Sequence, residues 1–370
     1  MFEQKSPVSF FLGANTPSGF VGYLNDLYDG KDGWRAMLIK SGPGTGKNTL
    51  IRAVMEAMEV LGEPLEIICC SSDPNSLDGI RCPQLKYCIL DGTAPHIMEP
   101  KYWGAVEEIV DLCACMDTEA LHREAKEIIR ITDACAAAHV RCRGLLRGAA
   151  SLLEENTRIA AEHTNFSKVL RTADRIAALE FGRKPAVPGK EQRRFLSAVT
   201  PEGPVFFGQT IASLCNKIYS VEDEYGAASG ALLSALRQRA LQAGLDIITC
   251  ACPLNPQEKI EHILIPSLCL GFTTSNRWHK VDAPVFRRIH AARFTDSRSL
   301  RTRKQILSFH RRAAKALLQE AVSAAVSAKA IHDQMEQFNV HAMNWKKAEE
   351  IQNAVVSRFE AASQAQKIRL

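Results

Sequence analysis

Short apolar runs alternate with long helical patterns along this chain. Apolar residues at 37–39, 65–70 and 85–90 are bounded by Gly, Pro or Asp, which predicts buried strands. The region from Ala105 to Leu179 is rich in Ala, Leu, Glu and Arg and contains no proline, which predicts helical hairpins. Because strands that alternate with helices favour parallel βαβ crossovers, we expect an α/β fold with a three-layer core.

The whole pattern occurs twice. The segment FLGANTPSG at 11–19 returns as FLSAVTPEG at 195–203, and LGEPLEIICCSSDP at 61–74 returns as AGLDIITCACPLNP at 243–256. A second proline-free helical pattern runs from 299 to 365. A chain of 370 residues is also longer than one core usually supports. We therefore expect two tandem α/β modules from an internal duplication, each with a long helical hairpin as an appendage.

The composition shifts place the boundaries of these parts. The stretch 182–192, with two prolines and two glycines, is the predicted linker. The predicted organisation is a first core at 1–104, a first helical region at 105–181, the linker at 182–192, a second core at 193–296 and a second helical region at 297–370.

The segment Ser41 to Thr49, SGPGTGKNT, has the spacing of a phosphate-binding P-loop between a strand and a helix. Its glycines let backbone N–H groups curl around phosphate oxygens at a helix N-terminus, and Lys47 supplies a charge for the β and γ phosphates. The predicted cofactors are ATP and Mg²⁺. The predicted nucleotide-binding residues are Gly42, Pro43, Gly44, Thr45, Gly46, Lys47, Asn48 and Thr49.

Two aspartates complete the predicted chemistry. Asp91 ends an apolar strand, as a Walker B carboxylate does, and is expected to hold Mg²⁺ together with Asn48. Asp73 follows another strand and is a candidate base. Lys47, Asp91 and Asp73 are thus the predicted catalytic residues. The usual P-loop pattern begins with Gly, where this chain has Ser41, and has Ser or Thr after the lysine, where this chain has Asn48. Nucleotide binding is therefore expected more firmly than hydrolysis.

The second copy lacks these charges. At an offset of 182 residues Lys47 aligns with Ser229 and Asp73 with Asn255, and Asp91 aligns with Thr274. The joint loss favours one charge-dependent site, in the first copy. By contrast His96 and Asp78 have counterparts in His279 and Glu261, which favours structural roles for them.

The charge, the cysteines and the hydropathy bear on nucleic-acid binding, zinc binding and membrane contact. The net charge is +5, and residues 287–315 hold ten Lys or Arg against the single acid Asp296. We favour a solvated surface for this stripe over a nucleic-acid site. The twelve cysteines include no CxxC pair, which favours reduced, buried thiols over a zinc site. With no run of 18 apolar residues, we expect a cytoplasmic protein without membrane contact.

The motifs FFLGANTPSGF, SGPGTGKNT, SSDPNSLDG and ILDGTAPH, with FLSAVTPEG and IEHILIPSL in the second half, resemble those of an uncharacterised bacterial family of tandem P-loop ATPases. The family is known only as ATP-binding or nucleotide-kinase-like. In such relatives both halves can carry an intact P-loop, from which this chain departs at Ser41, at Asn48 and throughout 223–233.

The resemblance implies an ATP-binding protein, and an Mg²⁺-dependent ATPase with one working site is our first expectation. One alternative is a nucleotide-sensing protein whose helical arms bind a protein partner, with negligible hydrolysis. Another is a kinase of a small molecule or nucleotide, with Asp73 as its base. For the first and last of these, Arg277, Arg287 and Arg288 are candidates to reach the transferring phosphate from the second copy.

Overall fold

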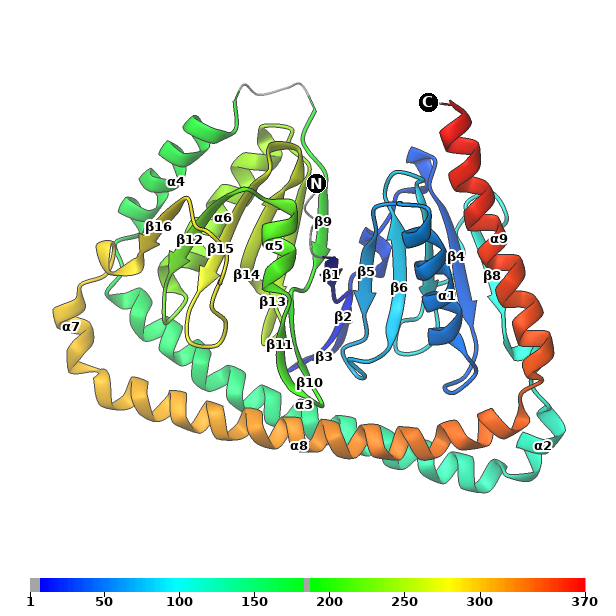
Figure 1. The fold of residues 1–370 in the computed structure, drawn as a ribbon. Coiled ribbons are helices and arrows are strands. Elements are labelled where there is room, and N and C mark those ends of the chain that lie inside the picture. The colour runs from blue at the N-terminus through cyan, green and yellow to red at the C-terminus, as the bar shows by residue number, and fades with distance from the viewer. Residues whose placement is uncertain (1–6, 183–186, 370) are drawn as a thin grey trace.

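The computed structural model describes residues 7–182 and 187–369 and has two mixed sheets of six strands with long helices outside them (Figure 1). The first sheet has the order β1-β5-β6-β7-β4-β8. Its strands are β1 (Val8–Phe10), β4 (Arg35–Lys40), β5 (Glu66–Cys69), β6 (Leu77–Cys82), β7 (Tyr87–Asp91) and β8 (Glu107–Asp111). A separate hairpin pairs β2 (Gly13–Thr16) with β3 (Gly19–Gly22), and α1 (Lys47–Val60) follows β4.

The second sheet repeats this order as β9-β13-β14-β15-β12-β16. Its strands are β9 (Glu191–Arg194), β12 (Lys217–Glu222), β13 (Ile247–Cys252), β14 (Asn255–Ile265), β15 (Leu270–Ser275) and β16 (Arg287–His290). The hairpin of β10 (Ser197–Thr200) and β11 (Gly203–Phe206) corresponds to β2 and β3, and α6 (Ala227–Gln242) corresponds to α1. The two halves meet where Phe11 and Phe195 exchange backbone hydrogen bonds of 2.9 Å in both directions.

The sheets are mixed: the expected parallel pairs are present, but antiparallel pairs that were not expected lie beside them. β6 runs antiparallel to both β5 and β7, and β14 runs antiparallel to both β13 and β15. The connections at these pairs are short turns, whereas a parallel crossover needs a dozen residues or more. The pairs on either side of β4 and β12 are parallel, as expected.

Each sheet buries both faces, but long helices cover only the outer ones. In β4, Ala36 and Leu38 face the other sheet, while Met37 and Ile39 face α1. The inner faces of the two sheets share one core with the short helix α5 (Gly208–Leu214). The predicted three-layer modules are therefore joined into one body with a shared centre.

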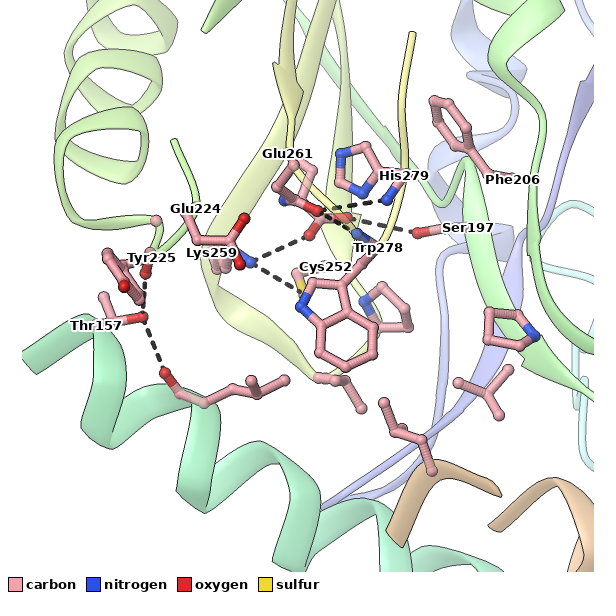
Figure 2. Close-up of a pocket in the computed structure, with 18 of the residues that line it drawn as sticks. Thr157, Ser197, Phe206, Glu224, Tyr225, Cys252, Lys259, Glu261, Trp278 and His279 are labelled. Carbon is pink, nitrogen blue, oxygen red and sulfur yellow. Dashed lines mark hydrogen bonds and ion pairs between the residues drawn. The ribbon is translucent and has the colours of Figure 1, made fainter. Parts of the chain in front are cut away.

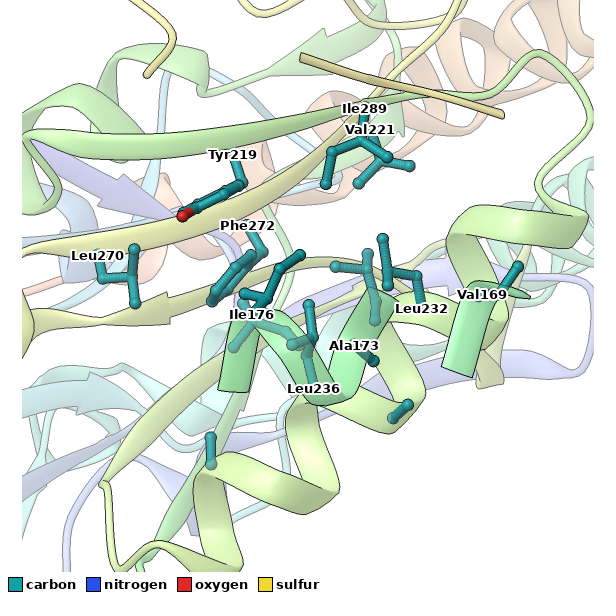
Figure 3. Close-up of a cluster of buried hydrophobic side chains, with 14 of the residues drawn as sticks. Val169, Ala173, Ile176, Tyr219, Val221, Leu232, Leu236, Leu270, Phe272 and Ile289 are labelled. Carbon is teal, nitrogen blue, oxygen red and sulfur yellow. The ribbon is translucent and has the colours of Figure 1, made fainter. Parts of the chain in front are cut away.

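The outer face of the second sheet shows how helices complete such a core. Figure 3 shows Leu232 and Leu236 of α6 packed against Phe272 and Tyr219 of the sheet. A second helix, α4 (Phe166–Glu180), adds Val169, Ala173 and Ile176 from outside. In the first half, α1 and the helix α9 (Trp345–Arg369) have the same arrangement.

The long helices exchange between the halves. α3 (Ala125–Glu162) and α8 (Lys304–Ala342) lie side by side along one end of both sheets, after the short helices α2 (Thr118–Arg123) and α7 (Ser297–Thr302) (Figure 1). α3 leads from the first half to α4, which packs on α6 of the second half. α8 leads back to α9, which packs on α1 of the first half. The helical regions were expected as appendages of their own modules, but each one completes the core of the other.

The observed elements shift two predicted boundaries. The first helical region was expected from residue 105, but β8 pairs with β4 inside that range because Ile109 and Val110 extend the sheet. β9 begins at Glu191, inside the predicted linker 182–192, of which 183–186 lie outside the described residues. Over the described ranges, no helix has both the length and the apolar character that crossing a bilayer requires.

Candidate functional site

The glycine-rich loop 41–46 joins the end of β4 to the start of α1. Gly44 and Gly46 adopt φ angles of 71° and 89°, which favour glycine. Thr45 donates its hydroxyl hydrogen to the Gly42 carbonyl at 2.8 Å, closing the turn. Since Gly46 is the N-cap of α1, the unpaired amides of the first helical turn begin at this loop. A helix N-terminus in such a turn favours an anion.

Lys47 and Asp91 lie together, as one site requires. β7 pairs with β4 so that Asp91 stands opposite Ile39, and Lys47 Nζ lies 2.9 Å from Asp91 Oδ2. Their side chains are only 17% and 14% exposed, so solvent screens the pair weakly. Lys47 Nζ also donates to Thr93 Oγ1 at 2.8 Å.

Thr93 is a site residue that the sequence analysis missed. Its backbone N–H donates to Asp91 Oδ1 at 2.9 Å, and its hydroxyl donates to the same oxygen. These bonds fix the carboxylate that faces Lys47. The Asp-Gly-Thr sequence after a buried strand is typical of such an Asx turn and was the available signal.

The other predicted residues have local partners. Asn48 accepts a hydrogen bond from the Leu77 N–H at 3.1 Å, so its amide oxygen ties α1 to the start of β6. Thr49 is exposed on the first turn of α1. Asp73 accepts bonds from the Asn75 N–H at 3.2 Å and the Ser76 hydroxyl at 3.0 Å, which hold the turn after β5. Coordination of Mg²⁺ by Asn48 and a base role for Asp73 stay predictions.

The arm that returns from the second half lies against the loop. Asn339 of α8 donates its side-chain N–H to the Pro43 carbonyl at 2.8 Å. A Cβ on Gly44 would lie 2.8 Å from the Glu336 carbonyl oxygen, and one on Gly46 would lie 3.3 Å from the Trp345 ring. Lys329 of the same helix lies 3.4 Å from Asp73. Sequence reasoning missed these neighbours because they belong to the other copy.

The corresponding turn of the second half is shorter, and one amide of the helix that follows it already has a partner. It has four residues, 223–226, where the first half has six, 41–46, and Gly226 at φ 83° takes the place of Gly46. Lys47 therefore corresponds to Ala227, not to Ser229 as the alignment predicted. Asp223 Oδ2 accepts a hydrogen bond from the Ser229 N–H at 2.9 Å. The protein's own carboxylate thus satisfies an amide of this helix end.

A pocket opens beside this shorter turn (Figure 2). Its cavity of about 120 Å³ is lined by the turn, the ends of β13 and β14, the β10–β11 hairpin and helices α3 and α8. Lys259 Nζ lies 3.2 Å from Glu261 Oε1 at its inner end. Burial alone would raise the pKa of Glu261, but Lys259 and the two neighbouring histidines hold it well below its ordinary value.

The arginines considered as long-range partners stay in the second half. Arg277 forms an ion pair with Glu224, and Arg288 lies 2.9 Å from Glu222. Arg287 stands beside Arg288 on β16, at the edge of the second sheet away from the first. The idea that they reach the first site was therefore wrong. In the basic stripe 287–315, every Lys and Arg is exposed except Arg311, which is partly buried.

A third group of side chains lies close to Lys47 and Asp91. Cys70, Asp78 and His96 offer ligand-type atoms within 4.8 Å of one another. Burial raises the pKa of Asp78, and the nearby His96 opposes that shift. Burial raises the pKa of the Cys70 thiol as well, with the Asp78 carboxylate adding to the rise. All twelve cysteines are free, in accord with the expected reduced thiols. The expectation that they are buried was wrong for Cys113 and Cys269, which are exposed, and for Cys69 and Cys70, which are partly exposed.

Comparisons of this chain with protein-family models, with curated proteins and with solved structures find no match.

Proposed function

We propose that the first half binds ATP with Mg²⁺ at the glycine-rich loop and hydrolyses it, as a P-loop NTPase with a single working site. One observation carries the proposal: Lys47 stands at the N-terminus of α1, after two left-handed glycines, with its ammonium 2.9 Å from the strand-end carboxylate of Asp91. A P-loop enzyme needs these parts in this order.

The chemistry follows from what each group offers a triphosphate. Backbone N–H groups of the loop would hold the β phosphate, and the Lys47 ammonium would bridge the β and γ oxygens. Because Asp91 lies 2.9 Å from the Lys47 ammonium, its carboxylate would stand near those oxygens and would hold Mg²⁺ directly or through water. Phosphoryl transfer needs mainly positioning and charge neutralisation, which these groups supply.

The second half is proposed as a duplicated module without nucleotide function. Its strand order matches that of the first, which supports the duplication. Ala227 stands at the position of Lys47, and Asp223 binds the amide of Ser229 at the helix end. The Asp223 carboxylate would repel a phosphate at this helix end, and the nearby ammonium of Lys259 is already paired with Glu261 at 3.2 Å. We therefore expect one nucleotide per chain.

A nucleotide-sensing role is the second candidate, and the contact between arm and loop favours it. Asn339 holds the Pro43 carbonyl, and Trp345 lies against Gly46, so any rearrangement of the loop on binding reaches α8 and α9 directly. In that case ATP would change how the arms meet a protein partner without turnover. Steady-state release of phosphate separates the two candidates.

Calorimetry of the full chain with ATP, GTP and ADP, each with and without Mg²⁺, tests the proposal. We expect a stoichiometry of one for ATP and tighter binding with Mg²⁺. Lys47→Ala should weaken ATP binding at least about tenfold, because one charge-assisted phosphate contact is worth about 1.5–3 kcal/mol. Lys315→Ala, at an exposed lysine of α8, is the matched control and should bind as the parent does. Full affinity in Lys47→Ala would refute the assignment.

A further inference from the structure

Three neighbouring segments of the first half bring a thiol, a carboxylate and an imidazole together. Cys70 follows β5, Asp78 lies in β6 and His96 lies beyond β7. Asp78 and His96 are each only 5% exposed, whereas Cys70 is partly exposed. A register irregularity between β5 and β6 falls next to Asp78, and β-bulges of this kind re-aim side chains near functional sites.

The carboxylate and the imidazole are in close contact and form an ion pair when His96 is protonated, but they are not hydrogen-bonded. Asp78 Oδ2 lies 3.2 Å from His96 Nε2, but this oxygen accepts no hydrogen bond within the described ranges. A buried carboxylate oxygen without a donor is costly. In a tetrahedral zinc site with bonds of about 2.0–2.2 Å, two ligand atoms are about 3.3–3.5 Å apart. The observed separation fits two atoms that face a shared ion.

The second half has equivalent residues to the Cys70–Asp78–His96 cluster, together with a lysine. The pair Ile68–Gly79 of the first half corresponds to the pair Cys250–His262 of the second. Counting along the chain from these pairs matches Cys70 with Cys252, Asp78 with Glu261 and Ser76 with Lys259. Lys259 Nζ lies 3.2 Å from Glu261 Oε1 and 3.7 Å from Cys252 Sγ, so an ammonium stands among these groups (Figure 2). The second half therefore supplies its own cation to the same set of side chains.

The first half lacks this internal cation at the corresponding position. Ser76 donates its hydroxyl to Asp73 at 3.0 Å and brings no charge. The nearby ammonium of Lys47 is paired with Asp91 at 2.9 Å. The set of thiol, carboxylate and imidazole is thus kept in both halves, but only the second half fills it from its own chain.

We propose that Cys70, Asp78 and His96 bind a divalent transition-metal ion of the zinc class. Thiolate and imidazole favour zinc over magnesium, so this site is distinct from the Mg²⁺ of the proposed nucleotide chemistry. Three protein ligands leave a fourth position for water or another ligand. Metal binding replaces the thiol proton, which passes to solvent. The proposal does not depend on nucleotide binding.

Cobalt is the probe, because Co²⁺ in a zinc site shows d–d bands and a thiolate-to-metal charge-transfer band. The metal-free full chain is titrated with Co²⁺ in the absence of nucleotide. We expect one equivalent with a charge-transfer band that Zn²⁺ abolishes by displacement. Cys70→Ser and His96→Gln should each lose the band, and circular dichroism checks that both variants are folded.

Matched variants separate this site from the alternatives. Cys252→Ser alters the equivalent thiol of the second half, and His332→Gln alters an accessible cluster on α8 that also has ligand-type side chains. Both should keep one equivalent and the full band. Lys47→Ala should do so too, so that failure of the ATP site and failure of the metal site are distinguishable. Absence of the band in the parent chain, or its survival in folded Cys70→Ser, would overturn the proposal.

A variant that removes the internal cation of the second half provides a second test of the metal site. Lys259→Ser gives the second half the serine that the first half has at position 76. We expect it to bind two equivalents of Co²⁺, with about twice the charge-transfer absorbance of the parent. A folded Lys259→Ser chain that still binds a single equivalent would contradict the comparison between the two halves.

Discussion

At the scale of single residues, two aspartates end the strands on either side of β4, but they differ in their contacts. Asp91 of β7 pairs with Lys47, whereas Asp111 of β8 accepts, among residues 7–182 and 187–369, only a bond from the Ala114 N–H at 3.3 Å. If Asp91 supports Mg²⁺, Asp91→Asn should lower the rate of ATP hydrolysis at least about 100-fold. Asp111→Asn, the matched strand-end control, should stay within about twofold. Equal losses in a phosphate-release assay would remove the special role of Asp91.

A buried histidine makes the stability of the second half depend on pH. Burial, together with His279, lowers the pKa of His262 to about 3. The unfolded chain binds the proton at about pH 6.5, so stability is full above that pH and is lost as the pH falls towards about 3. We expect the free energy of unfolding to drop by about 2 kcal/mol between about pH 6.5 and pH 4.5.

The variant that isolates this residue is His262→Asn, whose amide can replace the ring nitrogen 2.7 Å from Thr273 Oγ1. In urea unfolding at several pH values, the free energy of unfolding of this variant should fall less steeply with decreasing pH than that of the parent. His122→Asn, at an exposed histidine of α2, should follow the parent. An unchanged slope in His262→Asn would show that other groups cause the acid sensitivity.

At the scale of elements, the close packing of α8 on the glycine-rich loop can be measured with two glycines. Gly44 and Gly33 both have left-handed φ angles, 71° and 80°. A Cβ on Gly44 would meet the Glu336 backbone at 2.8 Å, whereas a Cβ on Gly33 would meet nothing within 4 Å. Gly33→Ala should cost about 1 kcal/mol of stability from the φ angle alone. Gly44→Ala should cost about 1–3 kcal/mol more and weaken ATP binding. Equal costs in chemical unfolding would show that α8 leaves room for the side chain.

Elements dominated by local sequence were predictable. The apolar run 37–39, the loop SGPGTGKNT and the proline-free helical regions each correspond to β4, the glycine-rich turn and the long helices. Strand direction was not predictable in the same way. Whether β6 returns antiparallel depends on short turns, and the apolar pattern of a strand buried on both faces is the same in either direction. Counting from the alignment also placed Lys47 opposite Ser229, because the second turn lost two residues without changing its flanking strand and helix.

The residues of the candidate site likewise include some that the sequence could predict and some that it could not. Lys47 and Asp91 were predicted as one site because the second copy lacks both charges, and the parallel pairing of β4 with β7 brings the two positions together. Asn339 and Trp345 could not, since their helical patterns say nothing about which half they cover. Cys70, Asp78 and His96 escaped the search for a metal motif because their spacing follows three strands of a sheet instead of a CxxC turn.

At the scale of the whole molecule, the exchange of arms makes each half depend on the other. α9 ends the chain after the second half, yet Phe359 is fully buried on the first half, stacked on Tyr87 with ring centroids 4.2 Å apart. α4 follows the first half, yet it completes the outer core of the second. Neither sheet with its own following helices therefore has a closed core. This architecture predicts that damage to an arm destabilises the half that the arm covers, not the half that precedes the arm in the sequence.

Phe359→Ala tests that dependence. Removing a fully buried phenylalanine leaves a cavity between α9, α1 and β7 and should cost about 3–5 kcal/mol. Because α9 covers the first half, hydrogen exchange should lose protection first at the amides of α1 and β7, while those of α6 keep theirs. ATP binding should weaken with it, since the glycine-rich loop begins α1. Phe309→Ala is the matched control, because Phe309 lies on α8 of the same arm and is 55% exposed. It should leave both hydrogen exchange and ATP binding unchanged.

In the Phe359→Ala chain, protection from exchange that is lost first in α6 would instead mean that α9 stabilises the half that precedes it in the sequence.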